Sequence, residues 1–175
     1  MLEPPIAVIA YGRTTRPDQA LAEAVWRLER RGLRVEGLTQ QPKASDTSAC
    51  ALLFLEDIAS GRRVQIFESR GAQARGCRLD AGGLATAAVW LRDAIARRPD
   101  VLFVNRFGRQ EADGRGLYAE IAEAISAEIP IIVAVGEEVM PHWKAFSGGS
   151  GSLLTNDADA IERWCVGAAP RVEHE

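Results

Sequence analysis

Polar side chains with distinct chemistry follow one short apolar segment of the chain. Residues 101–104 (Val-Leu-Phe-Val) predict a buried strand, and in an open α/β sheet ligands bind beyond the carboxyl ends of the strands. Guanidinium groups bind oxyanions through hydrogen bonds, whereas a carboxylate acts as a base or a metal ligand. Glu111 is therefore a candidate catalytic residue. The expected ligand-binding residues of this segment are Asn105, Arg106, Gly108 and Arg109.

A second loop, residues 12–18, follows the apolar run Ile6–Tyr11. A Walker A loop has the form Gly-x-x-x-x-Gly-Lys-Ser/Thr, and its backbone N–H groups surround a phosphate. Here Pro17, Asp18 and Gln19 occupy the places of the second glycine, the lysine and the hydroxyl. Pro17 lacks a backbone donor and Asp18 repels phosphate, so we do not expect a tight triphosphate site. The remaining anion-binding candidates are Gly12, Arg13, Thr14, Thr15 and Arg16. The alternative is an ordinary strand-to-helix turn with Asp18 as the helix cap.

The segment after residue 104 departs in the same way from a Walker B strand. That strand ends in an Asp that orders magnesium, often followed by a Glu that positions water. Asn105 and Arg106 replace these acids. An amide is a poorer magnesium ligand than a carboxylate, and arginine stays protonated and cannot act as a base. We therefore do not expect the usual hydrolysis, and a magnesium requirement stays open. The alternative is that Asn105 caps the turn and Arg106 pairs with Glu111 or another acid.

Asp80 is the second candidate catalytic residue. It follows residues 71–78, a basic stretch that we expect to be a loop at the site. Asp80 either caps a helix that begins near Gly82 or faces the site, and both interpretations stay open. Cys77 lies among arginines that would lower the pKa of its thiol, although a small packing residue is the favoured interpretation.

Two further groups of residues carry alternatives. Trp143 and Phe146 are spaced for one face of a helical turn, which favours core or dimer packing over a base-stacking surface. Glu137 and Glu138 follow the apolar run 130–135 and either line the same cleft or are solvated charges.

Alternating apolar runs and amphipathic segments predict the elements that position these residues. An opening strand, helix and second strand favour a parallel sheet with right-handed crossovers. Residues 51–56 and 63–68 are expected to form a hairpin at the sheet edge, and residues 40–49 a polar loop. The predicted strands are 6–11, 33–38, 51–56, 63–68, 101–104 and 130–135. The predicted helices begin at Asp18, Gly82, about Leu117 and Asn156, the last running through Trp164.

Bulk composition indicates one soluble α/β domain over residues 1–175, with a frayed tail from residue 170. Of the 175 residues, 47% are apolar and 26% charged, enough for a substantial core. A net charge of −3 without long charge runs argues against nucleic acid or anionic membrane as a partner. No signal peptide or membrane span is evident, and three widely spaced cysteines fit free thiols in the cytoplasm. Two histidines without a Cys-x-x-Cys make a zinc site improbable, so no metal ligand is assigned.

The motifs resemble two related families. Residues 12–41 and 61–135 are similar to the small P-loop nucleoside-triphosphatases of thermophiles, with Gly108, Arg109 (for Lys) and Glu111 matching and Asn105 and Arg106 departing. The chain is more closely similar to a bacterial domain-of-unknown-function family, whose members often lie near molybdate-transport genes. Its motifs correspond here to Cys77-Arg-Leu-Asp80, Asn105-Arg-Phe-Gly108 with Glu111, and Trp143-Lys-Ala-Phe146. The resemblance implies a P-loop NTPase-like, three-layer α/β fold with a mainly parallel sheet and degenerate motifs.

Three functions remain as hypotheses at this point. The first is an accessory or sensor protein that binds a nucleotide or a small oxyanion, linked to molybdenum or nitrogen metabolism. The second is an active nucleoside-triphosphatase with an altered mechanism, in which Asp80 or Glu111 acts as base or metal ligand. The third is a protein-interaction module without a ligand. A homodimer is an open possibility, because the oligomeric state is not encoded in any motif.

Overall fold

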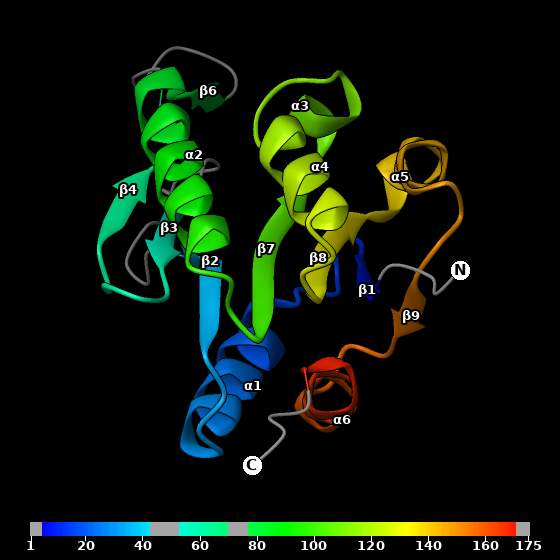
Figure 1. Ribbon diagram of the computed structural model, residues 1–175. Helices are drawn as coiled ribbons and strands as arrows, with labels where there is room; N and C mark the ends of the chain where they lie inside the picture. Colours follow the sequence, from blue (N-terminus) through cyan, green and yellow to red (C-terminus); the bar gives the residue numbers. More distant parts are fainter. Residues whose placement is uncertain (1–4, 43–52, 70–76, 171–175) are drawn as a thin grey trace.

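The computed structural model describes residues 5–42, 53–69 and 77–170. Within them, one seven-stranded sheet has the order β4-β3-β2-β7-β8-β1-β9, and β5 and β6 pair separately (Figure 1). The inner strands run parallel, whereas β3 and β4 extend one edge as an antiparallel hairpin. The strands are β1 Ile6–Tyr11, β2 Val35–Pro42, β3 Leu53–Asp57, β4 Arg63–Gln65, β5 Phe67–Ser69, β6 Cys77–Leu79, β7 Val101–Phe107, β8 Ile131–Gly136 and β9 Ser152–Leu154.

Helices cover both faces of this sheet. Helices α2 and α4 pack beside each other on the face turned to the viewer in Figure 1, and α1 packs with α6 on the opposite face. The helices are α1 Asp18–Arg30, α2 Ala81–Ala96, α3 Arg109–Ala112, α4 Tyr118–Ser126, the 3₁₀ turn η1 Glu137–Val139, α5 Met140–Ser147 and α6 Ala158–Ala168. The predicted three-layer α/β fold with a mainly parallel sheet is therefore confirmed.

The central strands are apolar on both sides because both of their faces are covered. In β8, Ile131 and Val133 point to the α2 and α4 side, while Ile132 and Ala134 point to the α1 side. Gly37 has φ +118°, and a Cβ there would lie 2.0 Å from the Phe103 carbonyl oxygen of β7. Only glycine allows β2 to approach β7 this closely.

Several sequence-based boundaries were wrong where pairing decides the structure. Strand β2 continues to Pro42, because its second half pairs with β3 after its pairing with β7 ends at Leu38. Residues 40–42 of the predicted polar loop thus belong to β2, and residues 43–52 lie outside the described residues. Strand β7 continues to Phe107 through the polar residues after 104. Cys77–Leu79 is strand β6 rather than loop, because it pairs with β5.

Two predicted helix caps were also wrong. Helix α1 begins after Pro17, and Asp18 is its first residue rather than its cap. The Asp18 carboxylate instead accepts a hydrogen bond from the Asn105 amide of β7. The cap of α6 is Asp157, whose Oδ1 accepts from the Ala160 N–H at 2.8 Å. Asp80 does cap α2 and accepts from the Gly83 N–H at 2.9 Å.

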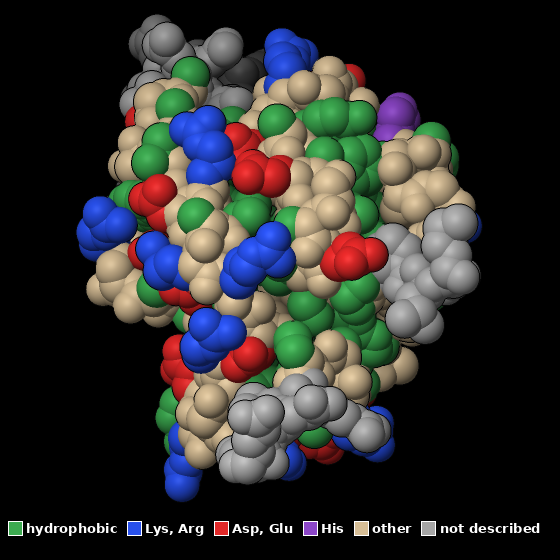
Figure 2. Space-filling view, viewed as in Figure 1, with side chains coloured by type: hydrophobic (Ala, Val, Ile, Leu, Met, Phe, Trp, Pro, Cys, Tyr) green, Lys and Arg blue, Asp and Glu red, His purple; other side chains and the backbone are tan. Residues whose placement is uncertain are grey.

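The surface drawn in Figure 2 carries charges of both signs. On the face shown in Figure 2, basic and acidic side chains are interspersed over the helices. In the part of the chain that the structure describes, no helix is long and apolar enough to cross a membrane. The predicted frayed tail lies outside the described residues except for Pro170.

Candidate functional site

A cleft of about 450 Å³ lies where the carboxyl ends of the central parallel strands meet. The end of β1 supplies one wall, the end of β7 a second, and the turn after β8 a third. This is the location expected for ligand binding in an open α/β sheet. Its lining residues are Tyr11, Gly12, Arg13, Arg16, Pro17, Asp18, Gln40, Asn105, Arg106, Gly136, Glu137 and Glu138.

The two replaced motif positions contact each other across this cleft. Asn105 Nδ2 donates a hydrogen bond to Asp18 Oδ1 at 2.8 Å. Asn105 is 2% exposed, so this contact ties the end of β7 firmly to the start of α1. The expectation that Asn105 caps a turn is wrong, since its amide bridges two elements that are 87 residues apart in sequence.

The first loop is closed by its own contacts. The Gly12 N–H donates to Thr15 Oγ1 at 3.0 Å, which removes a donor that a phosphate cradle would use. Asn156 Nδ2 donates to the Arg16 carbonyl at 3.2 Å and holds the loop from the opposite side. Arg13 and Arg16 line the cleft, whereas Thr14 and Thr15 are exposed and do not.

Glu137 covers the same loop from the turn after β8. A Cβ added to Gly12 would lie 2.8 Å from Glu137 Oε2, so a larger residue at position 12 would make this exposed carboxylate move aside. Glu137 and Glu138 therefore line the cleft, as one of the two alternatives for them predicted.

Arg106 is the basic side chain that β7 places in the cleft. The pairing of β7 with β8 shifts between Asn105 and Phe107, so Arg106 is the extra residue of a bulge, a device that redirects a side chain. Its guanidinium carbon lies 5.9 Å from the centre of the Tyr11 ring. Burial raises the pKa of the Tyr11 phenol, and the Arg106 charge opposes that rise.

Arg106 makes no ion pair within the described part of the chain. Its predicted pairing with Glu111 is wrong, since no ion pair joins the two side chains and the Glu111 carboxylate accepts from backbone N–H groups instead. Glu111 Oε2 accepts from the Gly108 N–H at 3.0 Å and Oε1 from the Leu117 N–H at 3.1 Å. Glu111 is 6% exposed and thus holds the turn between β7 and α4.

A second hollow of about 210 Å³ adjoins the cleft. Gln40, Asn105 and Arg106 line both, so they form the wall between them. The rest of the second hollow is mostly aliphatic, and Gly108, Arg109 and Glu111 also line it. Its remaining lining residues are Leu55, Ile66, Leu84, Gln110 and Leu117.

The structure brings most of the predicted residues together but not all of them. Arg109 lines the second hollow and forms an exposed ion pair with Glu138 at 3.9 Å. Asp80 caps α2 and is absent from the lining of both hollows. The loop 71–76 lies outside the described residues, as does the Cys77 side chain. Sequence reasoning missed Tyr11 and Gln40; the only signal was their position at strand ends.

Comparison with known proteins decides the family. A family model described as "Protein of unknown function (DUF2478)" matches residues 6–164. The chain belongs to the DUF2478 family. It is also 37% identical over 169 residues to the "Molybdenum import ATP-binding protein ModC 2" of Bradyrhizobium diazoefficiens. That match covers 96% of this chain and 19% of the relative, so the chain spans about a fifth of that protein's length.

Solved nucleoside-triphosphatase structures share the fold of this DUF2478 chain. The solution structure of a human cancer-related nucleoside triphosphatase superposes with a TM-score of 0.70 at 12% identity, covering 94% of this chain and 98% of that one. The crystal structure of THEP1 from the hyperthermophile Aquifex aeolicus superposes with a TM-score of 0.64 at 14% identity, covering 95% and 99%. The predicted P-loop NTPase-like fold is therefore confirmed.

The fold raises the question of whether this DUF2478 chain can hold a magnesium nucleotide in the P-loop manner. The Asn105 amide and the Asp18 carboxylate satisfy each other, Pro17 has no N–H, and the Gly12 N–H is already used. No three acid, histidine or cysteine side chains among the described residues gather closely enough to hold a metal ion. These residues do not fit a magnesium triphosphate at the first loop.

Proposed function

We propose that this DUF2478 chain is an accessory or sensor protein whose cleft binds an anionic group, either a small oxyanion or the phosphate of a nucleotide, without hydrolysing it. The observation that supports this most is Arg106. A bulge places its guanidinium at the carboxyl end of β7, where it lines both hollows and has no acidic partner among the described residues. A guanidinium in such a place binds oxyanions through paired hydrogen bonds.

The charges around the cleft support an anionic ligand. Arg13, Arg16 and Arg106 line it beside three carboxylates. Of these, Asp18 accepts the Asn105 amide and Glu138 lies near Arg109. Among the described residues Glu137 has no such partner, and its carboxylate lies close to Gly12 of the first loop.

The same contacts argue against hydrolysis. The lysine position holds a carboxylate, the magnesium position holds an amide, and the two are bonded to each other. Among the candidate bases, both oxygens of Glu111 and Oδ1 of Asp80 accept hydrogen bonds from backbone N–H groups. A base must be able to reach a substrate proton, so this arrangement favours binding over catalysis.

The pathway is inferred from the longer relative. A stretch of a molybdenum import ATP-binding protein shares 37% identity with this chain. We infer that the chain serves molybdenum uptake or use, with molybdate and tungstate as the oxyanions to test first. Because the match is a fifth of that relative, a second candidate is a module that contacts transport proteins and has no ligand of its own.

A thermal-shift screen followed by titration calorimetry tests the proposed function. The ligands are phosphate, molybdate, tungstate, ADP, ATP and GTP, each with and without magnesium. A ligand that binds only the folded state raises the melting temperature by mass action. We expect at least one of these anions to stabilise the protein without magnesium, and Arg106→Ala to weaken its binding at least tenfold.

The matched control is Arg115→Ala, which removes an exposed guanidinium that lies outside both hollows and pairs with Asp113 at 3.4 Å. It should bind like the unmodified protein. If no anion binds, or if Arg106→Ala binds as well as Arg115→Ala, the proposed site is wrong. Magnesium-dependent turnover of ATP would overturn the non-hydrolytic role.

A further inference from the structure

Gln40 is a buried amide with an unmet hydrogen-bonding group at the junction of the two hollows. It is 7% exposed, and its Oε1 has no hydrogen-bond partner in the part of the chain that the structure describes. Buried polar atoms are nearly always paired, and an exception in a native structure calls for an explanation. Gln40 lines both the cleft and the second hollow, so a bound ligand is the partner that its position favours.

The fold holds Gln40 there by strand pairing. Strand β2 parts from β7 after Leu38, and its continuation pairs Gln40 with Leu55 of β3. The β3 hairpin therefore buries a residue whose polar neighbours in the sequence predict a loop. An apolar side chain would satisfy this packing without leaving an acceptor unpaired.

The second hollow differs in character from the cleft. Four aliphatic side chains line it, namely Leu55, Ile66, Leu84 and Leu117. Ligand sites of this kind combine apolar walls with a few polar groups that fix orientation. A bare oxyanion gains nothing from aliphatic walls, whereas a flat organic ring buries its faces against them.

We propose that the cleft and the second hollow together form one bipartite site for an organic anion. Arg106 binds the anionic group of this ligand. A flat ring of the same ligand lies in the second hollow, where an N–H of the ring donates a hydrogen bond to Gln40. This rests on the proposed anion site and narrows its ligand to a nucleotide-like molecule. The torsion that turns a glutamine amide is broad, so rotation about it allows the oxygen of Gln40 to turn toward the ring. Asn105, held by Asp18, completes the wall between the two parts.

Calorimetry with a graded set of probes tests this assignment. The probes are inorganic phosphate, ribose 5-phosphate and the four ribonucleoside 5′-monophosphates, all without magnesium. We expect at least one nucleoside monophosphate that carries a ring amino group to bind at least tenfold more tightly than ribose 5-phosphate. In Gln40→Met, which keeps length and removes the amide, that preference should fall at least fivefold while phosphate binding is unchanged.

The control is Gln19→Met, which removes an exposed amide on α1 outside both hollows and should keep the preference. Gln40→Met should fold as well as the unmodified chain, since the lost oxygen has no partner. If phosphate or molybdate binds but bases add nothing, or if Gln40→Met keeps the base preference, the bipartite site is wrong and the anion site stands. If no probe and no oxyanion binds, both the proposed anion site and the bipartite site are wrong.

Discussion

At the scale of single residues, the informative feature is that both replaced motif positions retain partners. Asp18 and Asn105 stand where a lysine and a magnesium-binding Asp are expected, and they bond to each other at 2.8 Å. Either replacement alone would leave a buried amide or a carboxylate without a partner. The replacements at positions 18 and 105 therefore form one hydrogen-bonded pair. The sequence of either loop alone does not show this pair.

This pairing predicts the effect of changing its charge. Asn105→Asp places two carboxylates at hydrogen-bonding distance, and like charges this close disfavour ionisation of both. We expect the free energy of unfolding at pH 7 to fall by about 2 kcal/mol, the order of a lost hydrogen bond to a charged group plus repulsion. Chemical denaturation measures it.

The double variant Asp18→Asn with Asn105→Asp is the control, because it reverses the pair and restores one amide donor and one carboxylate acceptor. It should recover most of the lost stability. If the double variant is as unstable as Asn105→Asp alone, the Asn105–Asp18 contact does not hold the loops together.

Glu111 is a second residue whose role can be decided by one substitution. Its two oxygens accept from two backbone N–H groups, and a glutamine can offer only one oxygen. Glu111→Gln should therefore lower the free energy of unfolding by about 2 kcal/mol, since one buried donor loses its partner. Thermal and chemical unfolding check this. Unchanged stability, together with lost turnover of a nucleotide, would instead restore Glu111 as a catalytic residue.

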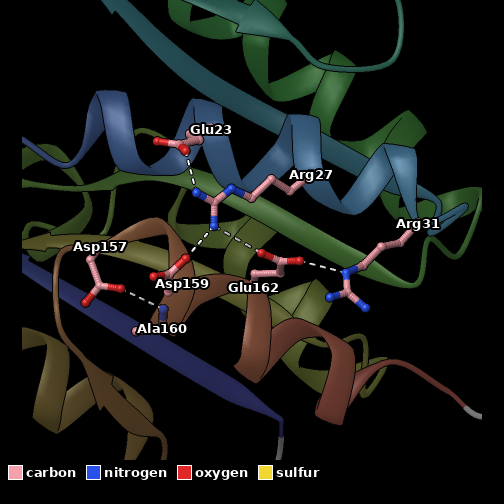
Figure 3. A network of polar contacts seen from close by, with 7 residues as sticks. All are labelled: Glu23, Arg27, Arg31, Asp157, Asp159, Ala160 and Glu162. Carbon is pink, nitrogen blue, oxygen red and sulfur yellow. Dashed lines mark hydrogen bonds and ion pairs between the residues drawn. The ribbon is translucent and has the colours of Figure 1, made fainter.

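At the scale of elements, α1 and α6 are joined by charged side chains rather than by apolar contact alone. Figure 3 shows Arg27 of α1 between Glu23, Asp159 and Glu162, and Arg31 reaching Glu162 at 2.6 Å. These residues are partly exposed, so each pair adds little by itself. Their shared geometry fixes how α6 lies against α1, and α6 in turn is preceded by Asn156, which holds the first loop.

The network makes the stability depend on pH in a defined direction. The hydrogen bond from Arg31 and then that from Arg27 hold the pKa of Glu162 below its ordinary value of 4.5. A depressed carboxyl pKa stabilises the folded state above about pH 4.5, and this contribution is lost as pH falls through the folded pKa. We expect Arg31→Gln to lose stability at pH 7 and much less at pH 3. Melting temperatures measured across this pH range test the prediction. The control is Arg115→Gln, which should change the melting temperature at pH 7 less than Arg31→Gln does.

At the scale of the whole molecule, the sequence predicts the architecture better than the details of the site. Hydrophobic runs such as 131–135 identify the buried parallel strands, because both faces of these strands must be apolar. The reach of β2 to Gln40 could not be predicted, since it depends on pairing with β3 and not on local composition. The Asn105–Asp18 contact spans 87 residues, and no local pattern encodes such a partner. Asp80, in contrast, follows a local cap rule, and one of its two interpretations was confirmed.

The packing of the whole molecule also controls the reactivity of the Cys165 thiol, which is a free thiol of the described residues. Cys165 of α6 is fully buried against the α1 side of the sheet, and burial raises the pKa of its thiol to about 12. A thiol reagent attacks the thiolate, so Cys165 should react very slowly in the native protein at pH 8. In a variant that keeps only Cys165, with serine at positions 50 and 77, labelling should accelerate with denaturant in parallel with unfolding followed by circular dichroism. Labelling that runs ahead of unfolding would mean that α6 detaches on its own. The charged network shown in Figure 3 would then be the weak link between α6 and the rest of the fold, and Arg27→Met should advance that labelling further.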